Sequence, residues 1–148
     1  DFLTFVKDTL EEFELAPANV TMELTETYFI KDNSAVLPVL NRLSEMGILL
    51  AMDDFGVGYS SLFALKNTPA GVIKIDRGFI KGITTDLFTS TFIRSITELC
   101  HDAGKRVCME GVETKEEYDL VKNIGIDLIQ GYYFGRPISA PMFEKHFL

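Results

Sequence analysis

The chain has 148 residues, 47% of them hydrophobic and 24% charged, which is the size and composition of one globular domain with a buried core. Its formal net charge of -8 argues against a surface for nucleic-acid polymers or anionic membranes, although it permits a phosphate ligand held through metal ions. The sequence contains no apolar run long enough for a membrane helix. Its two cysteines, Cys100 and Cys108, are expected to be core residues of a reducing compartment rather than a disulfide.

Apolar residues recur along the chain with helical and strand periods. In chain order they predict helix 2–15, strand 20–24, helix 34–46, strand 48–52, short helix 60–66, strand 72–76, helix 89–103, strand 106–110, a helix through 121 that a Thr114–Glu117 capping box opens, strand 126–130, and a last helix that Ser139 caps. Gly47 stops the second helix, and Pro38 is placed near its first turn, where proline is best tolerated. Glu26 and Thr27 are expected in a loop, as is 77–86.

Strands alternate with helices, which predicts an α/β fold with a parallel sheet. Parallel strands point their C-terminal ends to the same side, so polar residues at those ends should converge on one face. That face is where β/α barrels place their sites. The residues at or near the ends of the five strands are Glu23, Asp53, Asp54, Lys74, Asp76, Glu110 and Gln130.

Two adjacent carboxylates, Asp53 and Asp54, end an apolar strand and precede a glycine-containing loop. Like charges this close repel unless a cation lies between them, and hard divalent cations prefer oxygen ligands. The alternative is an Asp that caps the next helix beside a solvated Asp, and the pair alone does not decide between the two. Each other strand-end residue also has a structural alternative, such as a salt bridge for Lys74 or a turn for Gln130. Agreement among all five strands favours a site.

Five segments resemble the EAL domain family in order and spacing, from about residue 1 to the C-terminus. They are Glu23-Leu24-Thr25-Glu26, the segment 53–62 (DDFGVGYSSL), Lys74-Ile75-Asp76-Arg77-Gly78-Phe79, Glu110-Gly111-Val112-Glu113-Thr114 and Gln130-Gly131-Tyr132-Tyr133-Phe134. Members of this family are bacterial phosphodiesterases that open cyclic di-GMP to linear pGpG, using divalent metals in a β/α barrel. The resemblance therefore implies this fold, cyclic di-GMP as the ligand, and Mg²⁺ or Mn²⁺ as the cofactor.

The resemblance also implies a two-metal site, in which cations clamp both oxygens of an in-line displacement and a carboxylate activates the attacking water. The implied roles are Glu23 and Asp53 as metal ligands, Asp54 and Asp76 as holders of the second ion or its waters, Lys74 as a contact to the attacking water or a phosphate oxygen, Glu110 as general base, Glu26 as the residue that steadies the loop 54–61, and Glu113 and Gln130 as supporting or ligand-contacting residues.

The sequence also departs from the family pattern. The Glu-Ala-Leu strand and the Asn strand after it, both sources of metal ligands in the family, have no counterpart before Glu23, and Glu14-Leu15-Ala16 ends a helix instead. Residues 1–148 are therefore expected to be a truncated EAL domain, a partial (β/α)8 TIM-like barrel that lacks its N-terminal strands. Met109 stands before Glu110, where the family usually has Ala.

Five strands cannot close an eight-stranded barrel, so two strand edges and an apolar face would stay open. We expect self-association through that face, the alternative being a helix that covers it within one chain. Three functions remain: a cyclic di-GMP phosphodiesterase domain that is inactive as this piece alone, a non-catalytic cyclic di-GMP receptor, and an interaction module. The retained acidic residues and Lys74 favour the first. The expected location is cytoplasmic, with a membrane anchor elsewhere in the parent protein left open.

Overall fold

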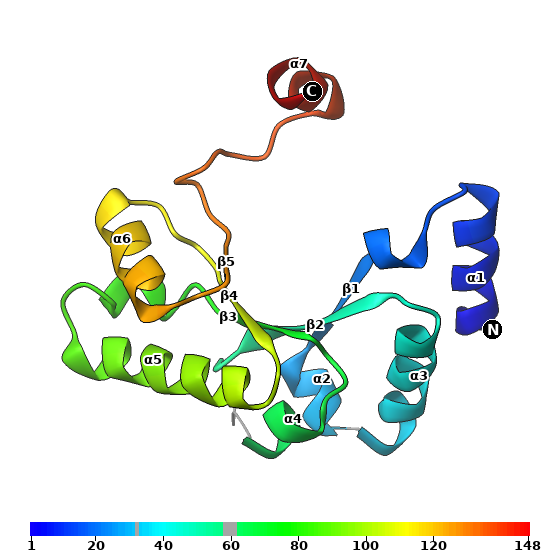
Figure 1. Ribbon diagram of the computed structural model, residues 1–148, viewed down its shortest axis with the longest axis horizontal. Helices are drawn as coiled ribbons and strands as arrows, with labels where there is room; N and C mark the ends of the chain where they lie inside the picture. Colours follow the sequence, from blue (N-terminus) through cyan, green and yellow to red (C-terminus); the bar gives the residue numbers. More distant parts are fainter. Residues whose placement is uncertain (32, 58–61) are drawn as a thin grey trace.

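A computed structural model describes residues 1–31, 33–57 and 62–148 (Figure 1). Its centre is a parallel five-stranded sheet in the order β1-β2-β3-β4-β5, as the alternation of strands and helices predicts. The strands are β1 Thr21–Thr25, β2 Leu49–Phe55, β3 Val72–Ile75, β4 Arg106–Met109 and β5 Leu128–Ile129. Each strand pairs with the next one along the chain. This is the arrangement of a section of β/α barrel wall, whose connecting helices lie on one face.

The connecting segments are mostly helical. The helices and 3₁₀ turns are α1 Phe2–Glu12, η1 Pro17–Asn19, α2 Glu26–Lys31, α3 Asn33–Glu45, α4 Leu62–Asn67, η2 Ile80–Gly82, α5 Leu87–Asp102, α6 Lys115–Ile124 and α7 Ala140–Phe147. Helices α2 and α3 contact β2, and α5 contacts β4. Figure 1 shows α2, α4 and α5 on one side of the sheet, while α7 stands apart on the other side.

The two faces of the sheet have different environments, because side chains alternate along each strand. One face is buried against the helices and forms the main core, with Leu50, Met52, Ile73, Ile75, Val107 and Met109. The opposite face carries a small separate apolar group of Ala51, Val72 and Cys108. The predicted site residues Asp53, Lys74 and Glu110 follow these three at intervals of two, so they extend the same face toward the strand ends.

Several sequence predictions are corrected by the structure. Glu26 and Thr27, expected in a loop, form the first turn of α2, because the chain passes from β1 directly into a helix. Pro38 lies inside α3 rather than near its first turn, since that helix begins at Asn33. A proline at such a position removes one helical hydrogen bond. The segment 77–86, expected to be a loop, contains the 3₁₀ turn η2.

Boundaries shift toward the C-terminal end of the chain as well. Strand β5 has two residues instead of the five expected over 126–130. Ser139 precedes α7, but its side chain makes no hydrogen bond to the helix, which has Pro141 in its first turn. The predicted capping box of Thr114 and Glu117 is confirmed at the start of α6. The short helix expected at 60–66 corresponds to α4, and residues 60 and 61 lie outside the described part of the chain.

Both cysteines are buried free thiols, as predicted. Burial raises the pKa of Cys100 and of Cys108 to about 11, so both thiols stay protonated at neutral pH. Within residues 1–31, 33–57 and 62–148, no helix combines the length and apolar character required to cross a bilayer.

Apolar side chains remain exposed at both ends of the molecule. Phe2 and Phe5 of α1 are exposed, and α7 buries none of its residues, leaving Phe143 and Phe147 open to solvent. The sheet ends at β1 on one side and at β5 on the other. Figure 1 shows α7 standing apart from the sheet.

Candidate active site

Lys74 is the central residue of the strand-end cluster. Its side chain is only 8% exposed, and Nζ lies 2.9 Å from both carboxylate oxygens of Glu23. The same nitrogen lies 3.0 Å from Asp53 Oδ1 and 2.9 Å from Glu110 Oε1. Glu23 comes from β1, Asp53 from β2 and Glu110 from the residue after β4. One lysine on β3 therefore connects the C-terminal ends of four strands.

The cluster keeps Lys74 charged. Burial by itself would lower the pKa of the ammonium group, but contacts with Glu23, Glu110 and Asp53 outweigh it and raise the pKa well above its ordinary value. One ammonium group faces three carboxylates here, so acidic groups outnumber the basic one. The cluster is therefore an anionic site in which only part of the negative charge is balanced.

The strand β2 is irregular where it carries the paired aspartates. Its pairing with β3 shifts between Met52 and Phe55, so that one extra residue enters β2. Asp54 takes a left-handed backbone with φ of 55°, a conformation that Asp tolerates better than most residues. Met52 and Phe55 both stay buried in the core, so the bulge lets the strand keep its packing while Asp53 reaches Lys74.

Glu26 anchors the start of the loop that follows β2. Glu26 is 2% exposed, and its Oε2 accepts a hydrogen bond of 3.1 Å from the Gly56 amide. Gly56 has φ of 101°, and a Cβ there would stand 2.4 Å from the ring of Phe79, so glycine is required. The contact involves the loop that Glu26 is predicted to steady. Residues 58–61 of that loop lie outside the described residues.

Besides Glu26 and Asp54, three further predicted residues have no ion pair with Lys74 in the described part of the chain. Asp76 Oδ1 accepts a hydrogen bond of 2.7 Å from the Gly78 amide, directly after β3. Glu113 and Gln130 instead line a cavity of about 190 Å³ together with Glu110. The backbone of Gln130 continues the β4–β5 pairing, because its amide donates to the Met109 carbonyl at 2.9 Å. The cavity therefore places Glu113 and Gln130 beside Glu110 rather than inside the lysine cluster.

The comparisons with known proteins identify the family. A family model described as EAL domain matches residues 1–137. This chain belongs to the EAL domain family. Among its curated relatives, the cyclic di-GMP phosphodiesterase RocR of Pseudomonas aeruginosa is 42% identical over 139 residues, which are 94% of this chain and 34% of RocR. The bifunctional diguanylate cyclase/phosphodiesterase MucR of the same organism is 37% identical over 91% of this chain and 20% of MucR.

Solved structures give the same identification. The EAL domain of Mycobacterium smegmatis DcpA superposes with a TM-score of 0.90 at 30% identity, covering 97% of this chain and 65% of that chain. A cyclic di-GMP complex of the PaMucR phosphodiesterase matches with a TM-score of 0.87 at 36% identity, covering 93% of this chain and 56% of that one. This EAL chain thus spans about a third or less of the curated relatives RocR and MucR, and about two thirds of a solved EAL domain.

The donor set of this EAL chain fits a hard divalent cation. All three partners of Lys74 offer carboxylate oxygens, and Asp53 Oδ1 is shielded from solvent with the Lys74 ammonium nitrogen 3.0 Å away. As the side chains stand, however, no three His, Cys, Asp or Glu groups of the described residues are arranged to hold a metal. The carboxylates are gathered around the ammonium group instead.

The cavity of this EAL chain also has members that the sequence analysis missed. Arg77 and Tyr132 line it beside Glu110, and the guanidinium of Arg136 lies 4.4 Å from the centre of the Tyr132 ring, within range of a cation–π contact. Arg77 directly follows Asp76, and Tyr132 lies two residues after Gln130. Their position next to predicted site residues is the signal that could have found them.

Proposed function

We propose that this chain is the C-terminal, substrate-handling part of a cyclic di-GMP phosphodiesterase domain, with residues 1–148 forming a truncated EAL domain. The observation that carries the proposal is the convergence of Glu23, Asp53 and Glu110 on Lys74 from separate strands. It occurs in a chain whose family includes curated cyclic di-GMP phosphodiesterases. Free buried thiols support a reducing, cytoplasmic location.

The proposed reaction is hydrolysis of one phosphodiester bond of cyclic di-GMP, giving linear pGpG. Mg²⁺ or Mn²⁺, when bound, supplies a water of lowered pKa and stabilises charge on the reacting oxygens. Structures of Klebsiella pneumoniae BlrP1 that hold cyclic di-GMP with manganese or with calcium support a divalent ion. The candidate ligands are Glu23 and Asp53, with Asp54 and Asp76 at the second ion or its waters.

The remaining residues act on water and ligand in this proposal. Glu110 accepts the proton of the attacking water, a role that its 18% exposed side chain beside the cavity supports. Lys74 stabilises that water or a phosphate oxygen through its charge. Glu26 holds the loop after β2 through Gly56. Glu113 and Gln130 contact the ligand or its bound water from the cavity wall.

A hydrolysis assay with Mn²⁺ tests this function. The chain as encoded, with any residues that precede Asp1 in its reading frame, should convert cyclic di-GMP to pGpG, and residues 1–148 alone should give no product above background. Glu110→Gln is the inactive comparison, and Glu98→Gln, an exposed change on α5, is the matched control. Ligand binding without turnover by the encoded chain would contradict the proposal in favour of a receptor. Absence of both binding and turnover would favour an interaction module.

We further propose that residues 1–148 self-associate, with a second copy on the sheet face that carries Ala51, Val72 and Cys108. Leu49 and Leu128 are exposed on that face, and the edges β1 and β5 offer unpaired backbone groups. Light scattering behind a sizing column should show a dimer or larger species. Leu49→Lys should weaken it, whereas Leu87→Lys, on the helix-covered side, should not. A monomer at high concentration would contradict the proposal.

A further inference from the structure

The proposed role of Lys74 in turnover does not explain why its side chain is buried among three carboxylates. A lysine that is 8% exposed is uncommon unless it is paired, and this one contacts three carboxylates that come from three other strand ends. Without it, Glu23, Asp53 and Glu110 would be like charges converging on the same point, and such charges repel. The ammonium group therefore occupies the position where a cation would be needed.

We propose that Lys74 is the built-in counter-ion of the metal-free site, and that an entering divalent cation takes Glu23 and Asp53 away from it. The inference rests on the proposed metal site. Three carboxylates converge on a single ammonium group, so acidic groups outnumber the basic one at the point where a divalent ion would bind. Asp53 Oδ1 is shielded from solvent and lies 3.0 Å from Lys74 Nζ, and Glu23 is the most open partner, with 47% of its side chain exposed.

Metal binding is then an exchange of partners rather than the filling of a preformed cage. Glu110, with 18% of its side chain exposed, is the least open of the three carboxylates and keeps its contact with Lys74 after the exchange. This exchange explains why the described residues offer suitable carboxylate oxygens but hold no three of them in the arrangement that a metal ion requires. It also makes Lys74 a positioning residue before it takes part in turnover. Removing its charge should destabilise the metal-free protein and at the same time strengthen metal binding.

The test compares the unmodified chain with Lys74→Met and with Lys145→Met, an exposed control on α7. Titration calorimetry with Mn²⁺ should show tighter binding to Lys74→Met, on the order of 10-fold, because one competing charge has gone. Without metal, the thermal midpoint of Lys74→Met should be lower than the midpoints of the unmodified chain and of Lys145→Met. Saturating Mn²⁺ should reduce this difference in thermal midpoint. If Lys74 only fills space, Mn²⁺ should leave the difference in thermal midpoint unchanged, and this result would overturn the proposal.

A second measurement needs no destabilised variant. In protein labelled with ¹⁵N-lysine, the Nζ resonance of Lys74, assigned by its loss in Lys74→Arg, should shift as Mg²⁺ is added. An unchanged resonance at saturating Mg²⁺ would refute the exchange. If Mn²⁺ binding depends on Asp53 but the unmodified chain and Lys74→Met bind Mn²⁺ with equal affinity, the metal site stands and the counter-ion role of Lys74 is wrong. If neither protein binds Mn²⁺, the metal site proposed above fails together with it.

Discussion

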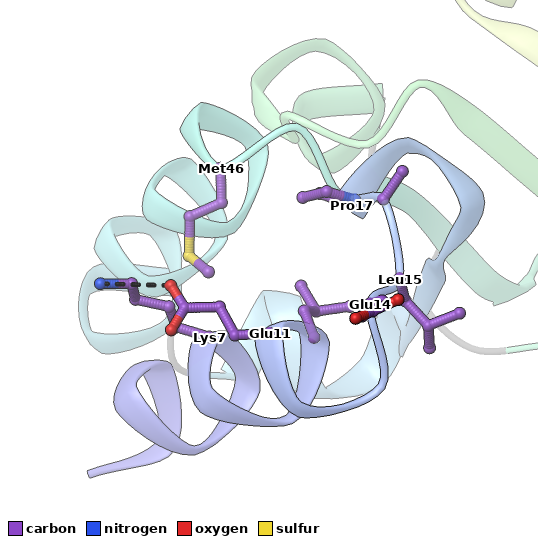
Figure 2. A pocket seen from close by; sticks show the side chains of 8 residues that line it. Lys7, Glu11, Glu14, Leu15, Pro17 and Met46 are labelled. Atoms are coloured by element: carbon purple, nitrogen blue, oxygen red, sulfur yellow. Dashed lines mark ion pairs between the residues drawn. The ribbon is translucent and has the colours of Figure 1, made fainter.

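The cluster around Lys74 and the cavity between α1 and α3 differ in what brings their charged residues together. The cavity has a volume of about 540 Å³ and is lined by Lys7, Leu10, Glu11, Glu14, Leu15, Ala16, Pro17 and Met46. Figure 2 shows apolar side chains in it, with the ion pair of Lys7 and Glu11 at its edge. That pair is 3.6 Å long, lies one turn apart on one helix and is well exposed, so it contributes little to stability.

The lysine cluster has the opposite character. Its members come from four strands and meet around a buried ammonium group, an arrangement that costs desolvation energy and requires compensation. The cavity of about 190 Å³ beside Glu110 is much smaller than the one at α1. Convergence of charge from separate elements, and not cavity size, therefore distinguishes the candidate active site in this molecule.

The largest expected effect comes from Glu110→Gln, which keeps the shape of the side chain but removes its ability to accept a proton. In the chain as encoded it should lower the rate of cyclic di-GMP hydrolysis by about 10²–10⁴-fold, the usual contribution of a general base. Ligand binding should stay close to normal in a calorimetric titration, and Glu98→Gln should retain full activity. Near-normal turnover by Glu110→Gln would reassign the base, and Glu113 would become the next candidate.

Leu10→Ala tests the cavity beside α1, the region compared with the lysine cluster. Leu10 is a buried residue of α1 that also lines the 540 Å³ cavity, and such truncations cost about 2–5 kcal/mol of unfolding free energy. Urea unfolding should show this loss, while Mn²⁺ affinity measured below the transition should not change. A large loss of metal affinity would show that the α1 region and the strand ends are energetically coupled and do not act as separate regions.

Asp53→Ala tests the acidic side of the cluster. Mn²⁺ affinity should fall at least about 10-fold, since even supporting groups around metals contribute 10–100-fold. Glu11→Ala, in the α1 region, removes a carboxylate of similar charge and serves as the matched control. Calorimetric titration of both variants measures the difference. Equal affinities would mean that Mn²⁺ responds to the net charge of the chain and not to this site.

Much of this arrangement could be predicted from the sequence, because strand-end polar residues in a parallel sheet must share one face. The sequence could not say which of them would meet. Asp76 lies two residues after Lys74, yet its carboxylate accepts a hydrogen bond from the amide of Gly78, two residues further along the chain. The sequence predicts a loop for Glu26, whereas the chain passes from β1 directly into α2. The partner of Glu26, Gly56, lies 30 residues away in sequence.

The smallest expected effect concerns Asp127, before β5 and remote from both regions. Its carboxylate accepts hydrogen bonds from the Val107 amide at 2.7 Å and contacts His101 Nε2 at 2.9 Å. Partial burial opposes ionisation, but these contacts outweigh it and lower the pKa of Asp127 below its ordinary value. A lowered folded-state pKa gives stability that is present above the ordinary value of about 3.9 and is lost as pH falls through the folded-state pKa.

Asp127→Asn should therefore cost about 1 kcal/mol at pH 7, the net value of such a hydrogen bond, and the cost should shrink toward pH 3. Urea unfolding at the two pH values measures the difference. Asp8→Asn, an exposed change on α1, should cost nothing at either pH. A cost for Asp127→Asn that persists undiminished at pH 3 would mean that the carboxylate contributes through packing and not through its charge. The contact of Asp127 with the Val107 amide of β4 would then stabilise the fold independently of charge. The Lys74 cluster, at the other end of the strands, is in contrast held together by charged groups.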